Sequence, residues 1–275
     1  MKNVISIDLE DWTHRPIVQP YIDKETICST LEESVNDILK VFNGYNKRTT
    51  FFVLGEIAEK QPEIIERIYE EGHEIAYHGY AHTPLQKQTV ASFREEIQKG
   101  KTIITRLIGE KPIGFRAPVF SLNNKTSWIL PILIKQGFLY DSSIVPAWSP
   151  LYGSPEAPTR IYYPDLEIPT HENPNQNEII EFPLAVAKLF GLKIPMAGGF
   201  YQRLFGNTIF LKNIKKINKT SPAMLYFHPW ELCGFQNIEM PFYKKYFAYF
   251  RTRNLKNLAH IVKNLEFTTA KEILL

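Results

Sequence analysis

The stretch EGHEIAYHGYAH, residues 71–82, decides how the fold of this chain is interpreted. Gly72 is typical of a helix end, and residues 74–77 form a short, mostly apolar segment such as a buried strand would have. His78 and His82 follow at the carboxyl end of this predicted strand. Because α/β sheets and barrels place their active sites at this end, the two histidines mark a candidate site.

Strand-like and helical segments alternate on both sides of this stretch. This order predicts parallel strands with right-handed helical crossovers. Residues 143–183, rich in proline and polar residues, interrupt the alternation and predict a long loop, either over the mouth of a barrel or as a disordered excursion. The predicted strands lie within 3–7, 48–55, 74–77, 113–118 and 223–231, and the predicted helices within 30–42, 62–71, 92–108, 125–136 (with a kink at Pro131) and 254–265.

Composition narrows the class of protein. With 275 residues and 44% hydrophobic residues, the chain can form one α/β domain spanning 1–275. The net charge of +3 is too small to indicate a basic nucleic-acid-binding surface. Cys28 and Cys233 are too far apart in sequence to suggest a disulfide framework or a cysteine metal site. No uninterrupted 18-residue apolar stretch predicts an integral membrane segment, and the N-terminal apolar segment is too short for a signal peptide. We therefore expect a cytoplasmic protein.

Polar side chains recur at the carboxyl ends of the predicted strands. Each has an ordinary explanation, such as a helix cap, a surface charge or a packed core histidine. Together, however, they would surround one point at the rim of a barrel, where two histidines and a carboxylate can hold one divalent metal, Zn²⁺ first and Fe²⁺ or Co²⁺ as alternatives. These side chains are Asp8, Glu10, Asp11, His78, His82, Arg116 and His228.

Six motifs resemble those of one known family, and they occur in that family's order. They are SIDLEDW (6–12), TTFFVLG (49–55), HGYAH (78–82), RAPVFS (116–121), GFLYDSSIVP (137–146) and LYFHPWE (225–231). The chain thus resembles the polysaccharide deacetylases of NodB homology, carbohydrate esterase family 4, and within them a subgroup with an Asp-x-Glu-Asp-Trp/Tyr first motif. The resemblance implies a distorted (β/α)7 barrel and metal-dependent removal of acetyl groups from N-acetylated sugars.

The resemblance also implies roles for individual residues. Asp8 would be the general base, oriented by Arg116, and His228 the general acid. His78 and His82 would be metal ligands. Because Leu9 follows Asp8 where many relatives have a second aspartate, the third ligand remains open between Glu10 and Asp11. Asp141 is a candidate support for the acid histidine.

Further residues could contact the substrate. The backbone N–H of Val119, just after the Arg-Ala-Pro turn, could help to stabilise an oxyanion. Trp230 could stack on a sugar, and a packed core residue is the alternative. Arg203, in MAGGFYQRLFG (196–206), could meet a phosphate or uronate; a surface arginine with no such role is the alternative. The expected substrate is an N-acetylated sugar, nucleotide-linked or lipid-linked, used in making surface polysaccharide or glycoconjugates.

Two other functions would require different residues at these positions. A non-catalytic carbohydrate-binding relative would be expected to lose Asp8 or His228, and a cyclic-amide hydrolase on the same barrel would be expected to lose the metal histidines. This chain keeps all of these residues. The sequence leaves the oligomeric state open.

Overall fold

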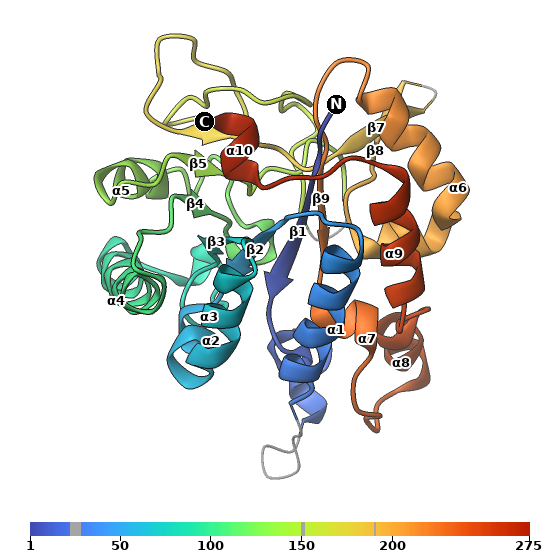
Figure 1. Ribbon diagram of the computed structural model, residues 1–275. Coiled ribbons are helices and arrows are strands. Elements are labelled where there is room, and N and C mark those ends of the chain that lie inside the picture. Colours follow the sequence, from blue (N-terminus) through green and yellow to red (C-terminus); the bar gives the residue numbers. More distant parts are fainter. Residues whose placement is uncertain (23–28, 150–151, 190) are drawn as a thin grey trace.

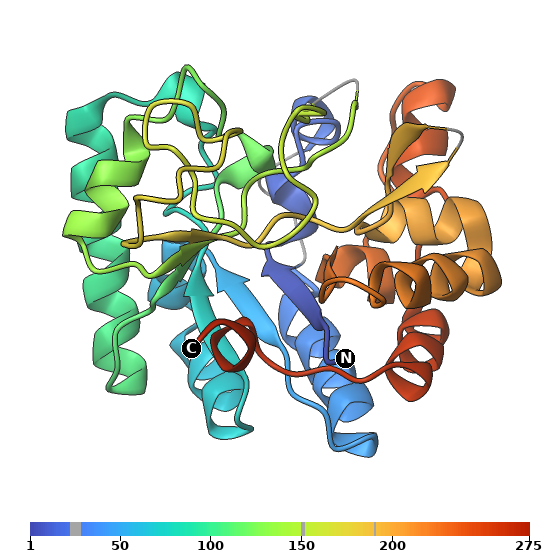
Figure 2. The same ribbon diagram turned by 90° about the horizontal axis from the view of Figure 1, so that it is seen from above.

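A seven-stranded parallel sheet forms the centre of the computed structural model, which describes residues 1–22, 29–149, 152–189 and 191–275 (Figures 1 and 2). Cys28 lies outside these described residues. The strand order is β6-β5-β4-β3-β2-β1-β9, so the last strand of the chain lies beside the first. The strands are β1 (Val4–Leu9), β2 (Thr50–Val53), β3 (Glu74–Tyr77), β4 (Gly114–Phe115), β5 (Tyr140–Asp141), β6 (Ile180–Glu181) and β9 (Met224–Phe227).

The sheet curls into a distorted barrel, which confirms the predicted fold class. Its two edge strands, β6 and β9, do not pair along their length. Isolated parallel bridges link Leu184 to Met224 and Gly198 to Tyr226, so short irregular segments fill the gap between these edges. The carboxyl ends of the strands therefore remain gathered at one rim.

Helices surround the outside of this curled sheet (Figure 1). They are α1 (Leu31–Gly44), α2 (Gly55–Lys60), α3 (Pro62–Glu70), α4 (Val90–Ile108), α5 (Ile129–Lys135), α6 (Gly199–Ile217), α7 (Pro229–Cys233), α8 (Phe242–Tyr249), α9 (Leu255–Asn264) and α10 (Ala270–Leu274). Short 3-10 turns lie at η1 (Trp12–His14), η2 (Gln19–Tyr21), η3 (Leu85–Lys87) and η4 (Pro118–Phe120). Because helices cover the sheet, β1, β2, β3 and β9 are buried along their whole length, which explains their apolar sequences.

The helix predicted over 125–136 begins later than expected. Residues before Ile129 form turns, and α5 runs from Ile129 to Lys135. Pro131 thereby falls in the first turn, where a backbone N–H has no partner within the helix, so it causes no kink in the helix interior. The predicted kink was therefore wrong.

The long segment predicted as a loop is mostly irregular, but it contains β6. Tyr162 and Glu181 form an antiparallel bridge, and Arg160 forms a two-pronged ion pair with Glu172. After it comes a hairpin of β7 (Val186–Leu189) and β8 (Leu192–Pro195), which the sequence did not clearly indicate. No helix in the described part of the chain is both long and apolar enough to cross a membrane.

Gly114 tests how tightly the sheet is packed. It pairs with Tyr140 of β5, and a Cβ at Gly114 would lie 2.1 Å from that buried ring. The ring cannot swing away, because its hydroxyl donates to Glu74 at 2.8 Å. We predict that Gly114→Ala lowers the free energy of unfolding by about 1–3 kcal/mol in urea titrations.

Gly44 provides the matched control for this substitution. A Cβ there meets nothing within 4 Å, so Gly44→Ala should leave stability unchanged or raise it by about 0.4–1 kcal/mol. Equal stability of the two variants would contradict the packing described for Gly114.

Candidate active site

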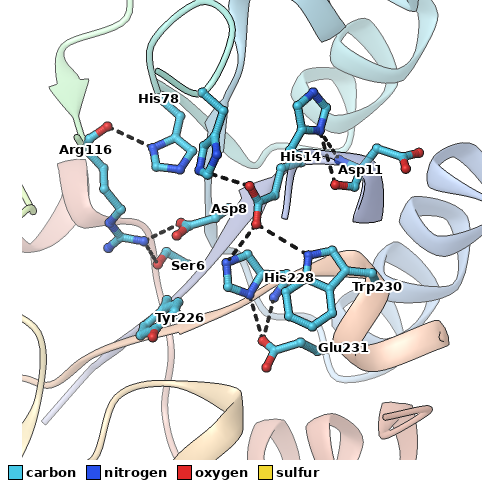
Figure 3. Close-up of polar contacts among 12 residues, drawn as sticks. Ser6, Asp8, Asp11, His14, His78, Arg116, Tyr226, His228, Trp230 and Glu231 are labelled. Atoms are coloured by element: carbon cyan, nitrogen blue, oxygen red, sulfur yellow. Dashed lines mark hydrogen bonds and ion pairs between the residues drawn. The ribbon is translucent and has the colours of Figure 1, made fainter. Parts of the chain in front are cut away.

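A buried ion pair between Asp8 and Arg116 lies at the end of β1 (Figure 3). Arg116 Nη1 donates to Asp8 Oδ1 at 2.5 Å and to Ser6 Oγ at 2.6 Å. Its other nitrogens donate to the carbonyl and hydroxyl oxygens of Ser142, each at 2.9 Å, and its guanidinium lies 3.9 Å from the ring centroid of Phe52. Arg116 therefore holds the Asp8 carboxylate in one position.

His78 is held in the tautomer that a metal ligand needs. Its Nδ1 lies 2.8 Å from the backbone oxygen of Arg116, so Nδ1–H donates and Nε2 keeps its lone pair. Burial lowers the pKa of His78 to about 4. The imidazole is therefore neutral near pH 7 and able to coordinate a cation through Nε2.

Glu10 lies between two histidines. Its Oε2 is 3.0 Å from His82 Nε2, and its Oε1 is 3.2 Å from His228 Nε2. The Trp230 indole N–H also donates to Oε1, at 3.4 Å. Burial would raise the pKa of Glu10, but His82 and His228 hold it well below its usual range. Glu10 is therefore a carboxylate in direct contact with the predicted site.

Asp11, the other candidate third ligand, has a different environment. Its carboxylate caps η1 by accepting from the backbone N–H of Thr13 at 3.1 Å, and it accepts from the Ser29 hydroxyl at 2.5 Å. Figure 3 shows its side chain directed away from His78 and His228. The geometry thus favours Glu10 over Asp11 as the third metal ligand, because the Asp11 carboxylate is already used to cap η1.

His228 is supported by a glutamate that the sequence interpretation missed. Its Nδ1 lies 2.8 Å from Glu231 Oε2, and its ring stacks on Trp230 with centroids 4.7 Å apart. Burial would lower the pKa of His228, but Glu10 and Glu231 raise it above its ordinary value. The missed signal was a Glu three residues after His228 in HPWE, the spacing of a capping box.

Arg203 has a structural role here. It is buried and donates to Glu231 Oε1 at 2.6 Å. Burial would raise the pKa of Glu231, but Arg203 and His228 lower it to about 2. Arg203 therefore keeps the support of His228 charged, and the expectation that it meets a substrate anion is not favoured by its position.

Asp141 does not contact His228. Its carboxylate accepts from the backbone N–H and the hydroxyl of Ser143, at 3.1 and 2.7 Å, and it pairs in register with Glu181. Burial raises the pKa of both carboxyl groups. The suggested support of the acid histidine by Asp141 is therefore replaced by Glu231.

The turn after Arg116 has a strained backbone. Val119 and Phe120 have φ angles of 51° and 52°, in the left-handed region that β-branched and bulky residues rarely adopt. The role of the Val119 N–H as an oxyanion donor stays a prediction. Phe120 also packs against Tyr226 at 4.8 Å and Tyr152 at 5.2 Å between ring centroids, which forms an aromatic wall beside His228.

The residues fit a divalent cation by their chemistry. Glu10 Oε2 is buried and has no aligned hydrogen-bond donor, although His82 Nε2 lies near it, and His78 offers a neutral Nε2. Glu10 Oε2 and His78 Nε2 therefore both have lone pairs available to coordinate a metal ion. Within the described ranges, however, no group of three or more histidine, cysteine, aspartate or glutamate side chains is already close enough together to hold a metal ion. Binding would require small movements of these side chains.

Two family profiles together match most of the chain. The profile described as polysaccharide deacetylase matches residues 21–133, and one described as a domain of unknown function (DUF3473) matches residues 142–275. A peptidoglycan-N-acetylglucosamine deacetylase of Bacillus cereus is 41% identical over 92 residues, which are 33% of this chain and 34% of that protein. A peptidoglycan deacetylase of Helicobacter pylori is 32% identical over 114 residues, 42% of this chain and 38% of that protein. The chain thus spans about a third of these relatives' length.

Solved structures show the same fold over almost the whole chain. A protein of Mycobacterium smegmatis assigned to the polysaccharide deacetylases has a TM-score of 0.61 and 20% identity, covering 99% of this chain and 88% of that one. PuuE allantoinase has a TM-score of 0.60 and 18% identity, with the same coverage. The fold alone therefore does not separate deacetylases from allantoinase. The matched profile over residues 21–133, these relatives and the shared fold show that the chain is similar to the polysaccharide deacetylases.

Proposed function

We propose that this protein is a metal-dependent hydrolase that removes acetyl groups from N-acetylated sugars. One observation carries the proposal: Asp8, fixed by Arg116, and His228, fixed by Glu231, lie near His78 (Figure 3). Glu10 contacts both His82 and His228, and the ring centroids of His82 and His78 lie 5.3 Å apart. The deacetylase activity named for the sequence relatives supports the proposal.

Hydrolysis of an amide needs an activated water, a stabilised oxyanion and a proton for the departing nitrogen. A divalent cation held by Glu10, His78 and His82, with Zn²⁺ preferred and Fe²⁺ or Co²⁺ as alternatives, would polarise the acetyl carbonyl and acidify water. The remaining requirements fall to the chain's own residues.

Proton transfer is assigned to Asp8 and His228. Asp8 accepts the proton of the attacking water, and its Oδ1 is held by Arg116 so that the carboxylate does not rotate. His228 donates a proton from Nε2 to the amine nitrogen as the C–N bond breaks. Glu231 holds the opposite nitrogen, Nδ1, and stabilises the protonated ring before transfer.

The proposed substrate is an amino sugar linked to a nucleotide or a lipid, within surface polysaccharide or glycoconjugate biosynthesis. The aromatic wall of Phe120, Tyr152 and Tyr226 lies beside His228, and of these rings Tyr152 is partly exposed, so it could stack on a sugar. Release of acetate from a panel of UDP-N-acetylhexosamines and lipid-linked sugars tests the proposal, and hydrolysis of allantoin without acetate release would contradict it.

The metal site makes the first prediction of this proposal. We expect about one divalent metal per purified chain by elemental analysis, with most of it lost in His78→Ala, His82→Ala and Glu10→Gln, because each removes one of the proposed ligands.

Asp11→Asn is the matched control for Glu10→Gln, since both remove one carboxylate charge. It should keep its metal, because Asp11 caps η1. Full metal retention in both histidine variants would refute the site, and loss in Asp11→Asn alone would reassign the third ligand.

The acid role of His228 predicts a dependence on the leaving group. His228→Ala should lower acetate release from N-acetylated sugars on the order of 10²-fold, because the amine needs a proton to depart. Activated aryl acetates should be hydrolysed nearly as well as by the wild type, because a phenolate leaves without one. Glu231→Gln should show the same selectivity with a smaller loss.

Metal content serves as the control for these two variants and should stay intact. Equal losses on both substrate types would show that His228 positions the substrate or the metal and is not the proton donor.

A further inference from the structure

The exposed face of α8 is aromatic where a surface helix is ordinarily polar. Four of its eight residues are large, aromatic and mostly exposed: Phe242 (84%), Tyr243 (62%), Tyr246 (55%) and Phe247 (57%). The inward position is the small, buried Ala248. Contiguous apolar surface of this kind marks an interaction site on a protein.

The lysines of α8 flank this aromatic face on both sides. At about 100° per residue, the four aromatic side chains span an arc of roughly 140°, and Lys244 and Lys245 lie about 60° beyond its two borders. Both lysines are only partly exposed, and Lys244 also donates to the Tyr21 hydroxyl at 3.1 Å. Long lysine side chains in such flanking positions extend their ammonium groups alongside an apolar surface.

The chain around α8 is strongly basic. Between residues 236 and 256 the only acidic residue is Glu239, against five basic residues, Lys244, Lys245, Arg251, Arg253 and Lys256. Arg251 and Arg253 are exposed. The aromatic face thus lies within a surface of positive charge.

The inner side of α8 is connected to the candidate active site. Ala248 packs in a small apolar cluster with Trp12, Trp230 and Phe235, and its carbonyl accepts from Arg15 at 3.2 Å. The Arg15 guanidinium in turn lies over Trp230, the residue whose indole donates to Glu10. Figures 1 and 2 both show α8 on the side toward which the strands of the sheet point, the side of the site.

We propose that the aromatic face of α8 docks this protein on an anionic lipid surface. Aromatic rings at the level of the headgroups, with basic side chains around them, are the composition of helices that lie in a membrane interface. A second copy of the chain fits less well, because lysine is depleted in protein–protein interfaces. If the proposed function holds, docking would bring the site close to a lipid-linked amino sugar.

Vesicle flotation with the full chain, without substrate, tests this proposal. The wild type should float with phosphatidylcholine vesicles containing phosphatidylglycerol, bind vesicles of phosphatidylcholine alone more weakly, and be released by high salt. Phe242→Ser/Phe247→Ser should weaken partitioning by about tenfold or more, because two exposed rings no longer enter the interface.

Tyr45→Ser is the matched control. Tyr45 is also an exposed aromatic residue (39%), but it follows α1 at the opposite end of the sheet, so its loss should leave flotation unchanged. Far-ultraviolet circular dichroism confirms that the variants are folded.

The proposal would be overturned if the wild type did not float with anionic vesicles, or if the double variant floated equally well. It would also be overturned if the wild type were a dimer, the double variant were a monomer, and neither bound vesicles. Because no substrate is present, none of these results bears on the deacetylase assignment.

Discussion

The buried pair of Arg116 and Asp8 is the interaction on which the rest of the site depends. Arg116 joins the ends of three strands, because it contacts Ser6 and Asp8 of β1 from its place after β4 and also reaches Ser142 after β5. Its backbone oxygen fixes the tautomer of His78. Removing either partner of such a pair leaves a buried charge uncompensated, at a cost of about 3–5 kcal/mol. Arg116 therefore connects the end of the sheet, the proposed proton acceptor Asp8 and the proposed ligand His78.

The site is assembled from both parts of the chain that the family profiles divide. The part matched as polysaccharide deacetylase contains His78, His82 and Arg116, whereas His228 and its support Glu231 come from the part described as a domain of unknown function. Strand β9 carries His228 to the site because it pairs with β1. The second part thus completes the sheet and supplies the proposed acid, so the two parts share one sheet and one site.

The sequence was sufficient to predict the features that depend on local hydrophobic pattern and on the order of the strands. Apolar strands ending in polar residues were enough to bring Asp8, His78 and His228 together, because parallel strands share one rim. It could not choose between Glu10 and Asp11, which differ only in the direction of their side chains after β1. It also could not foresee that Arg203 and Asp141 lie against Glu231 and Glu181, which are 28 and 40 residues away, because such pairings follow from packing.

Turnover of Asp8→Asn on an N-acetylated amino sugar tests the central claim most directly. The amide has the size of the carboxylate and can still face Arg116, but it cannot accept the proton of water. The account predicts that acetate release falls on the order of 10²-fold or more while bound metal stays at the wild-type level. Turnover within a few-fold of the wild type would contradict the assignment of Asp8 as the base and of its pair with Arg116 as the centre of the site.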